Sequence, residues 1–345
     1  MYFHRSIIMK RTKKYLTSKW LLSFFLLGFI CISLYLFMMR PWLMTFDSIE
    51  IDESISISPA DTYTYWTHAF DPLILVPYNL IGPVALIKLF NGSFDLIFLF
   101  YTFLFLFVLI RIYKYLGINP FLFATLMLIN PLIMFQFFAP NKEILIIISM
   151  LFIIVYIFSK KNFYLFCSLI LSALSKPEFL VLVLFFLIVR KFNKKLRPYI
   201  LLSMIIVLAL VYSNLPNMES QSEILLRGQT NSSLGITVLL QDLASKYYLY
   251  PIVIFPRIFL TLFESSTIFI LLSGICFLIA FIKVISKLGF RLNLDNDVFF
   301  IGYLFIIMVS IVPFPHHRYI LPLYPLLLIF LLRPNVLNNT TYKKV

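Results

Sequence analysis

Charged side chains stand at a few places between the long apolar stretches of this sequence. In the segment APNKE, Lys142 and Glu143 follow a proline and an asparagine. In LSKPEFL, Lys176 and Glu178 flank a proline. An Asn cap, a Pro at the first helical position and an acidic group in the first turn are typical of helix starts. Because charges beside apolar helices are costly, both segments are candidates for function as well as for capping.

The segment SPADTYTYWTHAF predicts a helix that Pro59 opens. Asp61 then lies in the first turn, where the helix dipole stabilises a carboxylate, and Tyr65 follows one turn later. Capping is one interpretation of Asp61, and a functional role is the other. The acidic residues that precede it are interpreted as a solvated face rather than a metal cage; they are Asp47, Glu50, Asp52 and Glu53.

The segment PFPHHRYILPLYP places two histidines and an arginine at a helix start that prolines interrupt. Arg318 can hold a phosphate through two parallel hydrogen bonds, and a neutral His316 or His317 can accept a proton. Tyr319 follows them and opens the last apolar run. Adjacent histidines lack the spacing of zinc ligands, so phosphate and proton chemistry is favoured over a zinc site.

A long polar segment, NLPNMESQSEILLRGQTNSSLGITVLLQDLASKYY, carries Arg227, and the apolar stretch YLYPIVIFPRIFLTLF after it carries Arg257. The mixture of polar residues with short apolar runs predicts amphipathic helices that lie on a membrane. Amides, carboxylates and aromatic rings of this kind bind sugar hydroxyls, and they also occur in ordinary loops.

The composition excludes a water-soluble globule, because 61% of the 345 residues are hydrophobic and only 13% are charged. Apolar runs near 20 residues predict membrane-spanning α-helices rather than a barrel. The net charge of +14 is spread over short loops, which favours membrane topology over nucleic-acid binding. Cys31, Cys167 and Cys276 all lie in apolar runs, where we expect buried packing rather than disulfide or metal chemistry.

Six basic segments define the topology if all of them are cytoplasmic: the N-terminus, RIYK, SKKN, RKFNKKLRP, SKLGFR and the tail TYKKV. The predicted crossings are then 20–39, 95–112, 119–138, 143–158, 163–175, 178–189, 199–213, 265–285, 298–314 and 319–332. We therefore expect an all-α, polytopic bundle of about ten spans. Its first helix is retained rather than cleaved as a signal peptide.

One membrane domain, 1–345, accounts for the whole sequence. Its cytoplasmic ends are 1–19 and 333–345, and its two outward-facing loops are 40–94 and 214–264. Two apolar stretches in these loops, 71–90 and 248–263, contain several prolines. Irregular backbone at membrane depth must be buried in protein or line a wet cavity, so both stretches are predicted to be interfacial or re-entrant. Nearly all the polar motifs then face outward.

The motifs ADTYTYW, PNKE, KPE and HHRYILPLYP resemble, in type and order, the membrane glycosyltransferases of the GT-C fold and the O-antigen and exopolysaccharide polymerases. The resemblance implies that Asp61 acts as a base or a metal ligand and that Glu143 is the second acidic group. It also implies that Arg318 holds a donor phosphate together with Lys142, Arg227 or Arg257. Other substrate-binding candidates are Glu178, His316, His317 and Tyr319.

Some members of these families carry two adjacent acidic residues in the first loop. This sequence lacks such a pair next to Asp61. The cofactor is therefore either absent or a divalent cation, with Asp61 as its ligand if there is one. The resemblance implies a bacterial inner-membrane enzyme that uses a polyprenyl-phosphate- or diphosphate-linked sugar and a glycan acceptor, among membrane lipid and without nucleic acid. A polymerase and a single-sugar transferase both fit, and a lipid-linked oligosaccharide flippase or a membrane scaffold are the alternatives.

Overall fold

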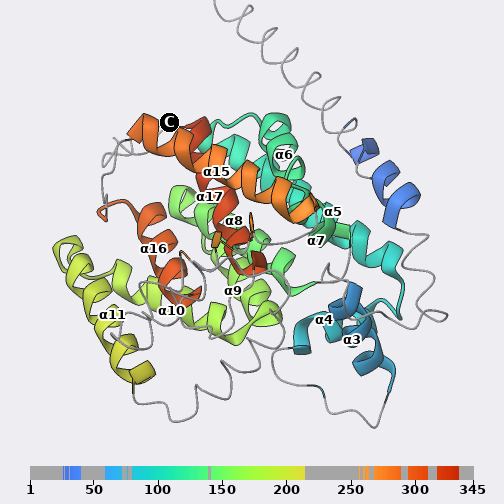
Figure 1. Ribbon diagram of the computed structural model, residues 1–345, viewed down its shortest axis with the longest axis horizontal. Helices are drawn as coiled ribbons and strands as arrows, with labels where there is room; N and C mark the ends of the chain where they lie inside the picture. The colour runs from blue at the N-terminus through green and yellow to red at the C-terminus, as the bar shows by residue number, and fades with distance from the viewer. Residues whose placement is uncertain are drawn as a thin grey trace, which may run out of the picture.

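In the computed structural model of the chain, all the regular secondary structure of the described residues is helical (Figure 1). These residues are 26, 28–30, 32–39, 59–71, 76, 80–138, 141–213, 256, 259–260, 262–263, 268–288, 294–309 and 317–333. Three of the described helices are long and apolar enough to cross a membrane. If a bent pair of shorter helices counts as one span, the described residues hold four candidate spans. The class of a helical membrane protein is thus supported, and the number of about ten spans stays a prediction.

The elements follow one another along the chain as short helices, long helices and turns. They are η1 (Tyr35–Met39), α3 (Pro59–Phe70), α4 (Ile81–Leu89), α5 (Phe94–Leu116), α6 (Pro120–Leu128), α7 (Pro131–Phe138), α8 (Lys142–Ser159), α9 (Asn162–Ser175), α10 (Pro177–Arg190), η3 (Lys194–Leu196), α11 (Arg197–Ser213), α15 (Ile268–Leu288), α16 (Asp297–Val309), η4 (His317–Leu323) and α17 (Tyr324–Leu332). The candidate spans are α5, α8 and α15 up to Lys287, and the bent pair is α6 with α7.

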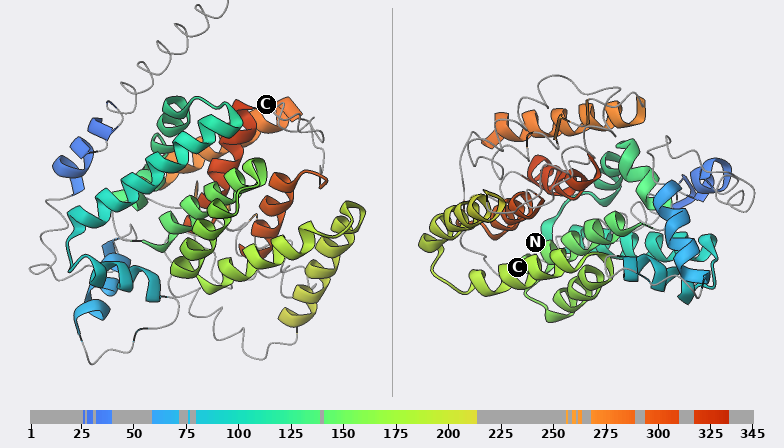
Figure 2. Two further views of the ribbon diagram at one scale, coloured as in Figure 1. Left: turned by 180° about the vertical axis from the view of Figure 1, so that it is seen from behind. Right: turned by 60° about the horizontal axis from the view of Figure 1, so that its bottom comes forward.

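Helix α8 forms the centre of the bundle. Its residues from Glu143 to Val155 are all buried, whereas α5 and α15 each keep a large apolar face exposed. Polar contacts join α8 to α9: the Ser149 hydroxyl lies 2.8 Å from the hydroxyls of both Ser168 and Ser172. Small hydroxyl-bearing residues of this kind let two helices approach closely in an apolar environment. Helices α3 and α4 lie at one edge of the molecule and α11 at the opposite edge (Figure 2).

The apolar run 119–138, predicted as one crossing, is not a single continuous helix. It forms α6 and α7, which are bent by 98° at the break between them. Asn130 stands at the break, and its side-chain oxygen accepts hydrogen bonds from the Ile133 backbone N–H and from the Ser273 hydroxyl. Because a proline disfavours the helical conformation of the residue before it, Pro131 interrupts the helix at Asn130.

The basic segments RIYK, SKKN and RKFNKKLRP, which the structure describes, lie at one end of the bundle. Arg190, which ends α10, and Arg197, which begins α11, each place a guanidinium nitrogen 2.7 Å from the Asp297 carboxylate at the start of α16. At the same end Arg333 donates to the Leu116 carbonyl, which lies at the end of α5. Helix α8 ends at Ser159, the first residue of the basic segment SKKN, and it has 18 residues. Its start therefore lies about 27 Å from the basic end. The membrane face on which either end lies stays a prediction.

Three smaller predictions lie partly outside the described residues. Helix α4 occupies nine residues of the stretch 71–90; about 20 residues are needed for a straight crossing, so α4 alone is too short to be one. The stretch 248–263 falls mostly outside the description, as does Cys31. Cys167 and Cys276 are free thiols that are partly buried and pack against the apolar core, as expected of packing residues.

Candidate functional site

The site is built around Glu143, in the first turn of α8. The Asn141 side chain accepts a hydrogen bond from the Glu143 backbone N–H at 3.3 Å, which confirms the predicted helix cap. Both residues are buried: the exposed fraction is 0% for Asn141 and 2% for Glu143. A carboxylate this deep in an apolar bundle is costly unless it has a partner of opposite charge.

That partner is Lys176, in the turn between α9 and α10. Its ammonium nitrogen lies 3.8 Å from the Oε1 atom of Glu143. The same ammonium stands over the Tyr319 ring, 4.3 Å from the ring centre. Residues from α8, from the α9–α10 turn and from η4 therefore meet around one cation, although Glu143 and Tyr319 are far apart in the sequence.

Electrostatic effects on Lys176 show which other charges surround it. Burial lowers the pKa of the Lys176 ammonium to about 8, and the positive charges of Lys142 and Arg318 act in the same direction. The Glu143 carboxylate and, more weakly, the Glu178 carboxylate oppose this effect. Two other cations and two carboxylates therefore act on the Lys176 ammonium at this end of the bundle.

One carboxylate oxygen of Glu143 is buried without a partner in the described structure. Its Oε2 atom is buried and has no hydrogen-bond partner among the residues that the structure describes, while Oε1 faces Lys176. We call Oε2 the open oxygen of Glu143. The Tyr101 hydroxyl of α5 is also buried without a hydrogen-bond partner among the described residues, and the Glu143 charge acts on it. A buried acceptor without a donor favours a ligand that carries an O–H or N–H group.

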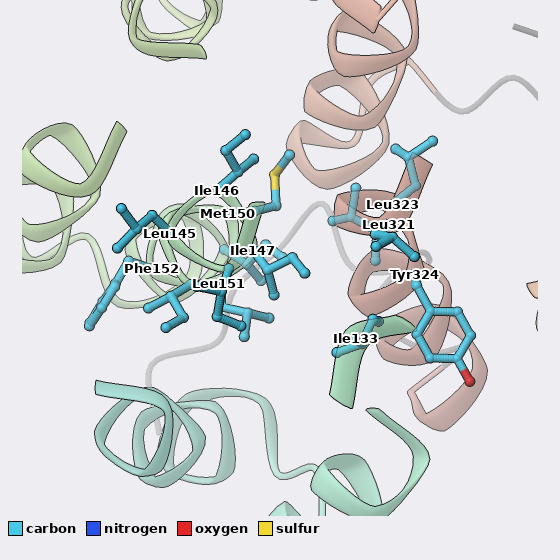
Figure 3. Packing of buried hydrophobic residues seen from close by; sticks show 14 of the residues in the cluster. Ile133, Leu145, Ile146, Ile147, Met150, Leu151, Phe152, Leu321, Leu323 and Tyr324 are labelled. Atoms are coloured by element: carbon cyan, nitrogen blue, oxygen red, sulfur yellow. The ribbon is translucent and has the colours of Figure 1, made fainter. Parts of the chain in front are cut away.

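Apolar packing fixes the elements that carry these groups. Helix α8 packs against η4, and side chains such as Ile147 of α8 and Leu321 of η4 lie on facing sides of this core, with Ile133 of α7 beside them (Figure 3). At the α9–α10 turn, Gly82 of α4 lies so close to the Leu174 carbonyl oxygen that a methyl group on Gly82 would overlap it. The site therefore stands on tightly packed helices.

The structure brings together several of the residues predicted from the sequence. They are Lys142, Glu143, Glu178, Arg318 and Tyr319. Asp61 is in the first turn of α3, as expected, and α3 packs on α4, which packs on α9. The side chains of Asp61 and His317 lie outside the described part of the structure, and so do the whole residues Arg227, Arg257 and His316.

Lys176 is the member of the site that the list of substrate-binding candidates lacked. The segment LSKPEFL marked it as a costly charge beside apolar helices, but its partners lie on other elements. Within the described residues, no group of three or more His, Cys, Asp and Glu side chains is placed to hold a metal ion. The proposed ligand, Asp61, is not included in that search, so its metal binding stays a prediction.

No protein family, curated protein or solved structure matches this chain. The functional argument therefore depends on the chain's own residues and their geometry.

Proposed function

We propose that this protein is an integral membrane enzyme that transfers a sugar from a polyprenyl-phosphate or polyprenyl-diphosphate carrier to a glycan acceptor. The observation that carries the proposal is the buried Glu143 carboxylate, whose open oxygen lies in a site with three cations. An acceptor hydroxyl satisfies the open oxygen, and a phosphate satisfies the cations. A donor and an acceptor of this chemistry supply both groups.

The reaction follows from these two requirements. The acceptor oxygen forms a bond to the anomeric carbon while the bond from that carbon to the phosphate oxygen breaks. Glu143 takes the proton of the acceptor hydroxyl as general base. Lys176, Lys142 and Arg318 stabilise the negative charge that develops on the departing phosphate. Asp61 remains the second candidate base. Its helix, α3, packs on α4, and α4 packs on α9, which ends at the turn that carries Lys176.

The surroundings of the site support a substrate that is half lipid and half polar. The charged groups lie at one end of an apolar bundle, so a polyprenyl tail can stay in the lipid while its phosphate reaches the cations. The basic segments that the structure describes lie at the other end, which by the positive-inside tendency is the cytoplasmic one. We propose that the site faces outward across a bacterial inner membrane, with cytoplasmic termini, and serves surface-polysaccharide assembly.

A flippase for lipid-linked oligosaccharides is the alternative. Its cationic residues are expected inside the spans, where they face a central cavity. In the candidate spans α5, α8 and α15, the charged residues lie within about two turns of a helix end. This placement favours chemistry at the bundle end over passage through its middle.

The cellular experiment compares polysaccharide from cells that express wild-type protein, Glu143→Gln or Lys195→Gln. Glu143→Gln keeps the shape of the side chain but removes the base, so we expect a loss of about 100-fold or more in transfer, the effect of removing a general base. Lys195 is exposed at the basic end and should be silent when changed. Unchanged polysaccharide length and composition with Glu143→Gln at normal protein levels would show that the proposal is wrong.

A further inference from the structure

We infer that the end of α5 and the start of α9 form a binding site for the phosphate headgroup of an anionic membrane phospholipid. We call the five residues of this site the basic patch; they are Arg111, Lys114, Tyr115, Lys161 and Tyr164. The basic patch lies at the opposite end of the bundle from the start of α8. The inference is therefore independent of the proposed function.

Two tyrosines form the middle of the basic patch. The Tyr115 and Tyr164 rings meet edge to face, with their centres 5.9 Å apart. The Tyr115 hydroxyl interacts with the Tyr164 hydroxyl and with the Lys161 ammonium. The charges of Lys114 and Lys161 act on Tyr115, and the charge of Arg111 acts on Tyr164. Three cations, from α5 and from the turn before α9, thus lie around one pair of phenol groups.

These cations lack a counterion among the described residues. Arg111, Lys114 and Lys161 take part in none of the ion pairs that the described structure contains. The acidic residues of α5 and α8 are Asp95 and Glu143, and both lie in the first turn of their helix, at the far end. Helix α9 has no acidic residue. The helices that form the basic patch therefore cannot neutralise it.

The turn between α8 and α9 adds further positive charge. Burial lowers the pKa of the Lys160 ammonium, and the charges of Arg190 and Lys194 act in the same direction. The Asp297 carboxylate opposes this effect, but it is already paired with Arg190 and Arg197, each at 2.7 Å. Because Asp297 is committed to other cations, an anion from outside the protein is the group that balances the basic patch.

The arginine of the basic patch is placed to bind a phosphate. Its guanidinium carbon lies 4.7 Å from the centre of the Phe107 ring, one turn earlier in α5, and this contact restricts the guanidinium. Its Nε atom is buried and has no hydrogen-bond partner among the described residues. Because Arg111 is partly exposed, its outer N–H groups can reach two phosphate oxygens. Lys114 and Lys161 are exposed beside it and add two further charges.

Exposed apolar side chains continue from the basic patch along both helices. They are Phe103 and Ile110 on α5, and Phe163 and Phe166 on α9. The Phe163 ring contacts the Phe107 ring, with centres 6.4 Å apart, so the two apolar strips are adjacent. A soluble phosphate would use only the cations, whereas a phospholipid also places acyl chains along the strips. Basic pockets at the membrane surface bind lipid headgroups in this way.

The test is native mass spectrometry of the full-length protein in detergent, with phosphatidylglycerol or zwitterionic phosphatidylcholine added. The wild type should bind one phosphatidylglycerol molecule more tightly than phosphatidylcholine. In the triple variant Arg111→Gln, Lys114→Gln, Lys161→Gln, the affinity for phosphatidylglycerol should fall on the order of 100-fold, because each cation near an anionic lipid contributes about 5-fold.

The matched control is the triple variant Lys191→Gln, Lys194→Gln, Lys195→Gln. It removes the same charge from exposed lysines after α10, at the same end of the bundle, and should keep the wild-type affinity. Phosphatidylglycerol with a photoreactive acyl chain locates the site on the wild-type protein, where we expect crosslinks to α5 and α9. This measurement can be read even if the first triple variant does not fold.

Four results would overturn the inference. They are equal affinity of the wild type for the two lipids, equal losses in the two triple variants, crosslinks confined to other helices, and displacement of the bound lipid by inorganic phosphate or polyprenyl phosphate at the concentration of phosphatidylglycerol itself. The last result would assign the basic patch to a soluble anion or to a lipid carrier instead of a membrane phospholipid.

Discussion

The strongest structural prediction concerns Asp297, which joins three helices at the basic end. Its two carboxylate oxygens are paired with Arg190 and Arg197, each at 2.7 Å. Arg197 is fully buried and also donates to the Leu294 carbonyl at 2.8 Å. Asp297→Asn keeps the size of the side chain but removes the charge that both guanidinium groups share. Two cations then face each other, one of them away from water.

The expected cost follows from the burial of the partners. Removing one member of a buried ion pair destabilises a protein by about 3 to 5 kcal/mol. The Asp297 and Arg190 side chains are each 15% exposed, so some charge remains solvated. We therefore expect a loss of about 3 kcal/mol, the lower end of that range. This corresponds to a change on the order of 100-fold in the unfolding equilibrium constant.

Reversible unfolding in mixed detergent micelles measures this difference, with Asp295→Asn as the control. Asp295 lies two residues away and is exposed, so its substitution should change stability by less than about 0.5 kcal/mol. The loss should also be non-additive with Arg197→Met, because the two residues share one interaction. If Asp297→Asn costs no more than Asp295→Asn, then α10, α11 and α16 are not held together at this point.

Two further predictions concern the site. The unprotonated Lys176 amine should react with a small acylating reagent along a titration curve centred at about pH 8, and Glu143→Gln should shift that curve to lower pH because it removes a charge that favours the ammonium form. Mass spectrometry measures the extent of Lys176 acylation at each pH, with Lys195 as an exposed reference. A midpoint near the ordinary lysine pKa of about 10.4 would contradict the burial of Lys176. Gly82→Ala should force α4 away from Leu174 and lower the free energy of unfolding by about 1 to 3 kcal/mol. An unchanged unfolding midpoint in the same micelle assay would show that the two helices are not in close contact.

Local signals in the sequence predicted where several helices begin. Pro59 opens α3, Asn141 caps α8 and Pro177 opens α10, as their residue types indicate. These effects act within one turn of a helix, so they can be read without knowledge of the fold. The basic segments RIYK, SKKN and RKFNKKLRP, which the structure describes, lie at one end of the bundle, because each of them ends or begins an apolar helix.

The sequence could not reveal which distant residues meet. Glu143 pairs with Lys176 and both lie near Tyr319 only because α8, α9 and η4 pack together. Asp297 is paired with arginines about 100 positions earlier in the chain for the same reason. The break at Asn130 had a local signal, the Asn-Pro dipeptide, but the uniform apolarity of the run 119–138 favoured one helix.

The most direct test of the proposed function is a transfer assay with purified protein in proteoliposomes. The donor is a radiolabelled sugar on a polyprenyl phosphate or diphosphate, and the acceptor is a glycan from the same cells. We predict that wild-type protein forms a labelled glycan and that Glu143→Gln reduces the rate by about 100-fold or more. Movement of the labelled lipid across the membrane without formation of a glycosidic bond, or an undiminished rate with Glu143→Gln, would contradict the assignment.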